Sequence, residues 1–223
     1  FDLGYLVSLF GDATLWDAAK TTVLLATFCW VVSAILGLIV AQAVRSRLRP
    51  VRWIAGGYVW FFRGVPMLLL ILFAYTAVPQ LVPGANTLFG DPLRAGAIAI
   101  VVSESAFMSE IFRGGIQAVD VGQMEAARSI GMGKAKAMWR VVLPQAFQVA
   151  LPPFSSGVVT LVKDSALSST IAVTEMTRQG QLLASSTFEN TTIYTMVAVG
   201  YLIINLPLIR ATKFLERRIG KSY

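Results

Sequence analysis

Few side chains in this sequence are able to carry chemistry. The chain has no histidine and a single cysteine, Cys29, which lies inside an apolar run. One thiol cannot form an intrachain disulfide, and the common zinc, haem and Cys/His nucleophile sites need residues that are missing. We therefore predict no catalytic residue, no metal site and no cofactor bound by this chain. The candidates that remain are charged side chains in or beside apolar sequence.

Glu104 is the first of these candidates. It stands between Ser103 and Ser105 near the middle of an apolar stretch. An ionisable group at membrane depth is costly and points to a function, such as binding a substrate ammonium, a proton or a cation. The alternative is a neutral or hydrogen-bonded carboxyl that holds two helices together. From the sequence, both interpretations stay open.

Arg63 precedes the apolar run 64–82, which is long enough to span a membrane by itself. In that arrangement Arg63 lies at the cytoplasmic boundary and extends to the headgroups. If the span begins at Trp53 instead, Arg63 is inside the membrane, where it can bind a substrate carboxylate at a high desolvation cost. The substrate pathway that we predict consists of Arg63, Ser103, Glu104, Lys163 and Asp164.

The rest of the sequence is typical of a membrane protein. The chain has 223 residues, of which 56% are apolar, and the mean hydropathy is +0.67. Five apolar stretches are long enough for the hydrocarbon core, which takes about 20 helical residues. Their ranges are 21–44, 64–82, 94–112, 141–162 and 191–209. We predict an all-α membrane protein with five transmembrane helices.

Local patterns add detail to these spans. Residues 51–62 are rich in Trp and Tyr, which favours an interfacial helix before the second span. In the first span, Ser33, Gly37 and Ala41 recur at four-residue steps and predict close packing against another helix. In the fourth span, the pair Pro152-Pro153 predicts a kink of the kind that can line a cavity.

The distribution of positive charge predicts the topology. Most of the 19 Lys and Arg residues lie after the first span, after the third span and at the C-terminus. These regions should face the cytoplasm and the N-terminus should face outside. The net charge of +7 is then an orientation signal, so we expect no nucleic-acid partner. The predicted organisation is an external segment 1–20, a five-helix membrane domain 21–216 and a cytoplasmic tail 217–223.

A Ser- and Thr-rich segment, 163–190, joins the last two spans on the external side. Residues 174–181 are predicted to form a short helix with Gly180 near its end. The segment either covers the pathway as a cap or serves as a solvated connector, and a connection of this length favours the cap.

The loop between the third and fourth spans has an unusual length and helical content. Asp120 and Gln123 fit a capping box for a first short helix, and glycine at 131 and 133 interrupts it. Residues 134–142 predict a second short helix, which Pro144 should end or kink. Gly131 is predicted to adopt a left-handed backbone conformation at the break. A loop of this kind, 120–143, is better suited to docking than to a simple reversal.

The spacing within this loop resembles the EAA loop of permease subunits in ATP-binding-cassette importers. The residues that carry the resemblance are Glu125, Ala126, Ala127, Gly131, Leu143 and Pro144. Val141 stands where the family usually has isoleucine. Two further segments, the Arg63-Gly64-Val65-Pro66 tetrad and residues 104–123, resemble the polar amino acid branch of that family.

The resemblance implies the partners and the energy source. It implies two cytoplasmic ATPase subunits that bind ATP and Mg, a second permease subunit that is either identical or related, and an extracytoplasmic amino-acid-binding protein, with the chain in the bacterial cytoplasmic membrane. The loop would carry ATPase motion into alternating access. Gly220-Lys221-Ser222 ends like a phosphate-binding loop, but Leu215 replaces the first glycine, so we expect no nucleotide site here.

Other functions remain to be weighed against this one. An ion-coupled secondary transporter could use Glu104, although we find no internal repeat of the kind such carriers show. An importer of the same type for another small polar solute and a scaffold subunit without transport activity are further alternatives.

Overall fold

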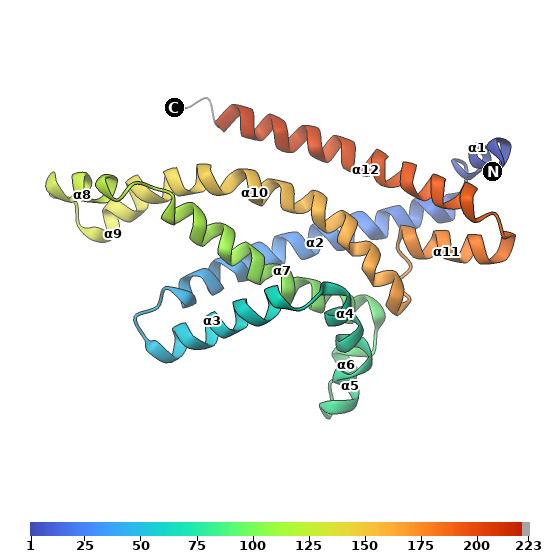
Figure 1. Cartoon of the computed structure of the whole chain (residues 1–223), viewed down its shortest axis with the longest axis horizontal. Coiled ribbons are helices and arrows are strands. Elements are labelled where there is room, and N and C mark those ends of the chain that lie inside the picture. Colours follow the sequence, from blue (N-terminus) through green and yellow to red (C-terminus); the bar gives the residue numbers. More distant parts are fainter. Residues whose placement is uncertain (220–223) are drawn as a thin grey trace.

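The computed structural model describes residues 1–219, which form helices and short connections without a strand (Figure 1). The prediction of an all-α protein is confirmed. In chain order the helices are α1 (Leu3–Leu9), α2 (Ala13–Val44), α3 (Arg49–Gly64), α4 (Met67–Thr76), α5 (Val78–Leu81), α6 (Asn86–Phe89), α7 (Pro92–Gln117), α8 (Val121–Ser129), α9 (Lys134–Ala137), the π-helix η1 (Met138–Val142), α10 (Leu143–Asp164), the 3-10 helix η2 (Ser165–Ile171), α11 (Met176–Thr187) and α12 (Asn190–Ile219).

Helices α2 and α7 pack along each other at the centre of the bundle. The predicted small-residue stripe of α2 lies in this contact, with Ser33 and Ala41 buried and Ser33 Oγ donating to the carbonyl of Val101 at 3.3 Å. A Cβ built on Gly37 would lie 2.6 Å from Cβ of Met108. Only glycine permits this approach, so the prediction of close packing is confirmed.

The prediction of one uninterrupted span over 64–82 is wrong. The chain breaks at Val65 and Pro66, and α3 and α4 meet at 104°. Val65 is extended, with φ −97° and ψ 132°, because the ring of the following proline disfavours a helical conformation there. The ten residues of α4 cover only about 15 Å, half of a hydrocarbon core.

Helix α3 is therefore part of the bundle. It packs against α2 and α7 through Ala55 and Val59, and the predicted interfacial helix over 51–62 lies within it; its depth in the membrane stays a prediction. The alternative that began the span at Trp53 agrees with the structure in placing Arg63 within a helix, but this helix begins at Arg49 and leaves the Arg63 side chain 44% exposed. Its outer face still presents Trp53 and Trp60, with 76% and 79% of their surface exposed.

Several predicted boundaries shift. Helix α2 begins at Ala13, inside the predicted external segment 1–20, because Asp12 caps it by accepting the amide of Thr14 at 2.8 Å. Helix α12 continues through the predicted start of the tail at residue 217. The Gly220-Lys221-Ser222 sequence lies outside the described residues.

Length and apolar composition qualify three helices of residues 1–219 to cross a membrane, namely α2, α7 and α12. The bent pair α3–α4 is a fourth candidate. Helix α10 is 22 residues long but carries Gln, Ser and Pro among its apolar residues and does not meet the same criterion. Its ribbon is curved (Figure 1), and Pro152 and Pro153 lie inside it, where neither can donate a backbone hydrogen bond.

The charged connections gather at one end of the long axis. The α2–α3 connection, α8 with α9, and the C-terminal end of α12 lie at the left in Figure 1, whereas α1 and α11 lie at the right. Helix α11 is longer than the predicted 174–181 and packs on α2 and α12. Gly180 lies in its middle, where a Cβ would lie 2.5 Å from the side chain of Val197.

Candidate functional site

The loop between α7 and α10 forms the helix pair that the sequence predicts. Asp120 caps helix α8, and its carboxylate accepts the amide of Gly122 at 2.6 Å. The predicted capping box does not form, because the Asp120 carboxylate bonds Gly122 and not the amide of Gln123, and the Gln123 side chain accepts a hydrogen bond from Gln145 at 3.2 Å.

Gly131 ends α8 in the left-handed conformation, with φ +87°. Its amide donates to the carbonyl of Arg128 at 3.0 Å, and the amide of Met132 donates to the carbonyl of Ala127 at 3.1 Å. This pair of bonds defines a Schellman motif, which needs a residue of positive φ at the position of Gly131. The conformational prediction for Gly131 is confirmed.

The second half of the loop differs from the prediction. Pro144 neither ends the second helix nor separates it from the next span, because α9, η1 and α10 run on continuously. A proline has no amide to donate, and the chain accommodates it with a π-turn in which Leu143 donates to the carbonyl of Met138. The loop is thus rigidly continuous with α10.

The loop presents an exposed mixed surface. Glu125 and Ala126 are exposed on α8, while Ala127 is buried against the loop. Large apolar side chains are exposed beside them, with Ile130 at 77% and Trp139 at 73%. The helix pair projects from the bundle at the charged end of the molecule (Figure 1).

A second site is a cavity of about 580 Å³ between α3, α4, α7 and α10, which we call the polar pocket. Four of the five predicted pathway residues line it: Arg63, Ser103, Glu104 and Asp164. The break between α3 and α4 contributes residues 63–67 to the lining, and α10 contributes residues between Pro153 and Asp164. Lys163 is exposed and does not line the polar pocket. It lies on a different face of α10 from the lining residues Thr160 and Asp164, which are one helical turn apart.

Arg63 is held at the edge of the polar pocket. Its guanidinium lies 3.4 Å from the carboxylate of Glu110 and 5.6 Å from the ring centre of Phe107. Glu110 forms a closer, bidentate pair with Arg113, at 2.6 and 2.8 Å, which confirms the pairing expected from their spacing. Arg63 is 44% exposed and therefore keeps donors for another anion.

Sequence reasoning missed several lining residues. Ser156 and Thr160 add hydroxyl groups from α10, and Gly157 allows the close approach of Trp30 and Met108. The Pro152-Pro153 pair was the available signal, since Pro153 itself lines the cavity.

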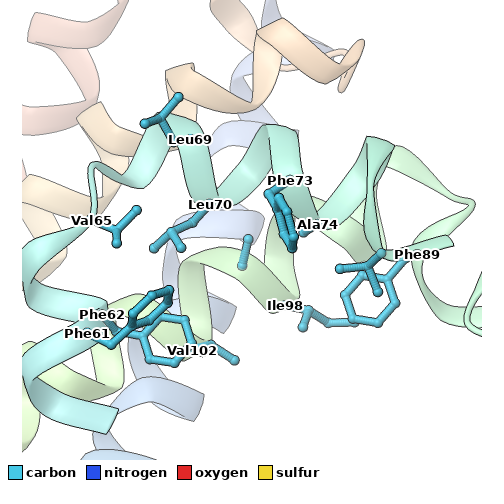
Figure 2. Close-up of a pocket in the computed structure, with 12 residues that line it drawn as sticks. Phe61, Phe62, Val65, Leu69, Leu70, Phe73, Ala74, Phe89, Ile98 and Val102 are labelled. Carbon is cyan, nitrogen blue, oxygen red and sulfur yellow. The ribbon is translucent and has the colours of Figure 1, made fainter. Parts of the chain in front are cut away.

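A second cavity, the apolar pocket, also lies at the α3–α4 break. It has a volume of about 380 Å³ and is lined by apolar side chains, including Phe61, Phe62, Leu70 and Phe73 (Figure 2). It shares Val65 with the polar pocket. Because it holds no charged or hydrogen-bonding side chain, it offers no chemistry for a polar solute.

The segment between α10 and α12 contains a buried carboxylate that the sequence did not single out. Glu175 caps α11 by accepting the amides of Thr177 and Arg178 at 2.9 and 2.8 Å. It also accepts the hydroxyl of Tyr201 from α12 at 2.8 Å. Burial raises the pKa of the Glu175 carboxyl, and these hydrogen bonds partly oppose the shift. The network ties α11 to α12.

Known proteins share this architecture. The chain is 35% identical over 207 residues to the probable glutamine ABC transporter permease protein GlnM of Bacillus subtilis, covering 93% of this chain and 94% of that protein. It is 36% identical over 201 residues to the L-cystine transport system permease protein TcyB of Bacillus subtilis, covering 90% and 84%.

Solved structures agree with the sequence comparison. The crystal structure of an amino acid ABC transporter with histidines matches with a TM-score of 0.89 at 31% identity, covering 98% of this chain and 99% of that one. The MetNI methionine ABC transporter, in an inward-facing conformation, shares the fold with a TM-score of 0.69 at 18% identity. An ion-coupled carrier finds no support among these relatives.

The family described as "Binding-protein-dependent transport system inner membrane component" matches residues 33–221, which include both the loop and the polar pocket. Its members are transport components, and ATP hydrolysis is the task of a separate subunit. The chain belongs to this family of inner membrane components and is the permease subunit of a binding-protein-dependent ATP-binding-cassette transporter.

Proposed function

We propose that this permease imports polar amino acids and that the polar pocket is their binding site in the membrane. The observation that carries the proposal is a cavity of amino-acid size with side chains of both charges on its walls. The relatives named above support the substrate class, because glutamine and L-cystine appear in their names.

The charges in the polar pocket suit a zwitterion. The free donors of Arg63 can bind the α-carboxylate, and Glu104 or Asp164 can bind the α-ammonium. Glu110 and Arg113 do not line the pocket but join Arg63 through ion pairs, and with them the group holds three carboxylates and two guanidiniums. An amino acid with one extra positive charge balances this set, so we propose a preference for cationic substrates over neutral ones and for neutral ones over anionic ones.

The loop between α7 and α10 is proposed to couple the site to ATP. Glu125, Ala126, Ala127 and Gly131 would dock in a groove of the cytoplasmic ATPase, with ATP and Mg bound there. Leu143-Pro144 and the π-turn would transmit the movement directly into α10, which forms one wall of the polar pocket.

The assembly follows from the coupling. Two such permeases around a two-fold axis, two ATPases and an extracytoplasmic binding protein would complete the transporter. We propose five membrane crossings, with α3–α4 as a broken second crossing, in the bacterial cytoplasmic membrane. The charged end of the molecule would face the cytoplasm and α11 the outside.

Binding to the purified complex tests the substrate proposal. Labelled lysine, glutamine and glutamate are compared by equilibrium dialysis, and lysine should bind most tightly. Glu104→Gln and Asp164→Asn should each weaken lysine binding about tenfold or more, because each removes a charge facing the ligand. The matched control is Asp17→Asn, which alters an exposed pair with Lys20. Unchanged binding in both pocket variants would rule out this site.

A further inference from the structure

Tyr58 forms the shortest polar contact between α3 and α7. Its hydroxyl donates to the carbonyl of Val102 at 2.6 Å and lies 2.6 Å from Oγ of Ser105. Ser105 Oγ also donates to the carbonyl of Val102, at 3.0 Å, so the three groups form a closed set. The ring of Tyr58 packs against Phe62 at 4.7 Å between ring centres.

Two further polar contacts join these helices, and both are longer. Ser103 Oγ lies 3.5 Å from the carbonyl of Phe62. The pair between Arg63 and Glu110, at 3.4 Å, is partly exposed, and Glu110 is already held closely by Arg113. Apolar side chains fill the rest of the contact, and the hydrogen bonds add a directional link between the helices. The hydroxyl of Tyr58 is the closest polar link between α3 and α7.

The register of α3 along α7 matters for the polar pocket. Val102 and Ser105 lie on either side of Glu104 in α7, and Arg63 follows Tyr58 by five residues in α3. A slip of one residue along a helix moves a side chain by about 1.5 Å, which is enough to lose a two-point contact with a small zwitterion.

We propose that Tyr58 is a positioning residue for substrate binding. Its hydroxyl fixes the spacing between Arg63 and Glu104 across the polar pocket without touching the substrate. The proposal rests on the proposed function of that pocket. We expect loss of the Tyr58 hydroxyl to change substrate affinity and not coupling to the ATPase, because Tyr58 lies neither in the loop between α7 and α10 nor in the contact of α2 with α7.

Uptake kinetics in proteoliposomes test this assignment. The full complex is reconstituted with its ATPase and binding protein, and the uptake of labelled lysine is measured over a range of concentrations. Tyr58→Phe keeps the ring and loses the hydroxyl. We expect its KM to rise about threefold to tenfold, with the maximal rate and the basal ATPase activity unchanged. Tyr194→Phe, which removes an exposed hydroxyl on α12, should match the wild type.

Two companion variants separate the outcomes. Ser105→Ala removes one of the two partners of the hydroxyl and should raise KM less than Tyr58→Phe, which keeps the test available if the latter does not assemble. An unchanged KM in Tyr58→Phe overturns the positioning role if Glu104→Gln still raises it. If neither variant changes KM, the polar pocket itself is wrongly assigned. A lower maximal rate with constant KM also contradicts the proposal.

Discussion

The Schellman turn at Gly131 gives the sharpest test of the coupling loop. With φ at +87°, an L-residue other than Gly, Asn or Asp is strained there. A Cβ built on Gly131 would meet nothing within 4 Å, so Gly131→Ala introduces no clash within the chain. Its cost is confined to the backbone and amounts to about 1 kcal/mol, or about fivefold in the population of the turn.

Larger changes at Gly131 should rank by backbone preference. Gly131→Val places a β-branched residue in the left-handed region, at a cost of about 2 kcal/mol or more. Gly131→Asn should stay close to the wild type, because asparagine adopts this conformation readily. Gly133→Ala is the matched control, since Gly133 has φ −62° and also meets nothing within 4 Å.

Receptor-stimulated ATPase activity and uptake of the reconstituted complex are measured together for this series. We expect stimulation to fall in the order wild type, Asn, Ala, Val, with the Gly133→Ala control near the wild type. The membrane helices do not involve Gly131, so the yield of inserted protein should be constant. Full stimulation and uptake in Gly131→Val would refute the coupling role, and so would equal losses in Asn and Val.

Three further predictions address orientation, the polar pocket and the external network. Arg47→Cys should be inaccessible to a membrane-impermeant thiol reagent in intact cells, whereas Asn86→Cys and Ser186→Cys should react, and labelling of the first would reverse the orientation. Glu104→Gln should reduce uptake with little loss of assembled complex, since the side chain keeps its shape; unchanged uptake with a lower melting temperature would make the carboxylate structural. Burial raises the pKa of the Glu175 carboxyl in the folded protein above its ordinary value of about 4.3. Protonated Glu175 therefore stabilises the folded state fully at a pH below about 4.3, and this stabilisation is lost as the pH rises through the raised folded-state pKa. Glu175→Gln, which does not ionise, should therefore show a flatter fall of melting temperature with rising pH, and identical pH profiles would contradict this.

Patterns with a strong local cause were predictable from the sequence. The stripe of Ser33, Gly37 and Ala41 indicated a close helix contact because small residues at four-residue steps share one helix face. Gly131 indicated a left-handed turn because two helical segments meet there and glycine has little backbone penalty. Neither inference required knowledge of distant contacts.

The remaining differences arose where local signals compete with tertiary packing. Hydropathy alone cannot detect a break within an apolar run. The break at Val65 and Pro66 was therefore missed, and α4 was predicted as part of one longer span over 64–82. Pro144 was expected to end or kink the helix, and the helix continues through it with a π-turn. Glu175 was overlooked because its partner Tyr201 is 26 residues away and comes near only in the fold.

ATP hydrolysis by a partner subunit is expected to drive amino acid import through this permease. The direct test measures lysine uptake into proteoliposomes that hold the permease and its ATPase, with binding protein outside. Uptake should occur only when ATP and Mg are enclosed, and it should be lost when the ATPase is omitted, whatever ion gradient is imposed. Concentrative uptake by the permease alone, driven by a proton or sodium gradient and abolished in Glu104→Gln, would contradict this expectation.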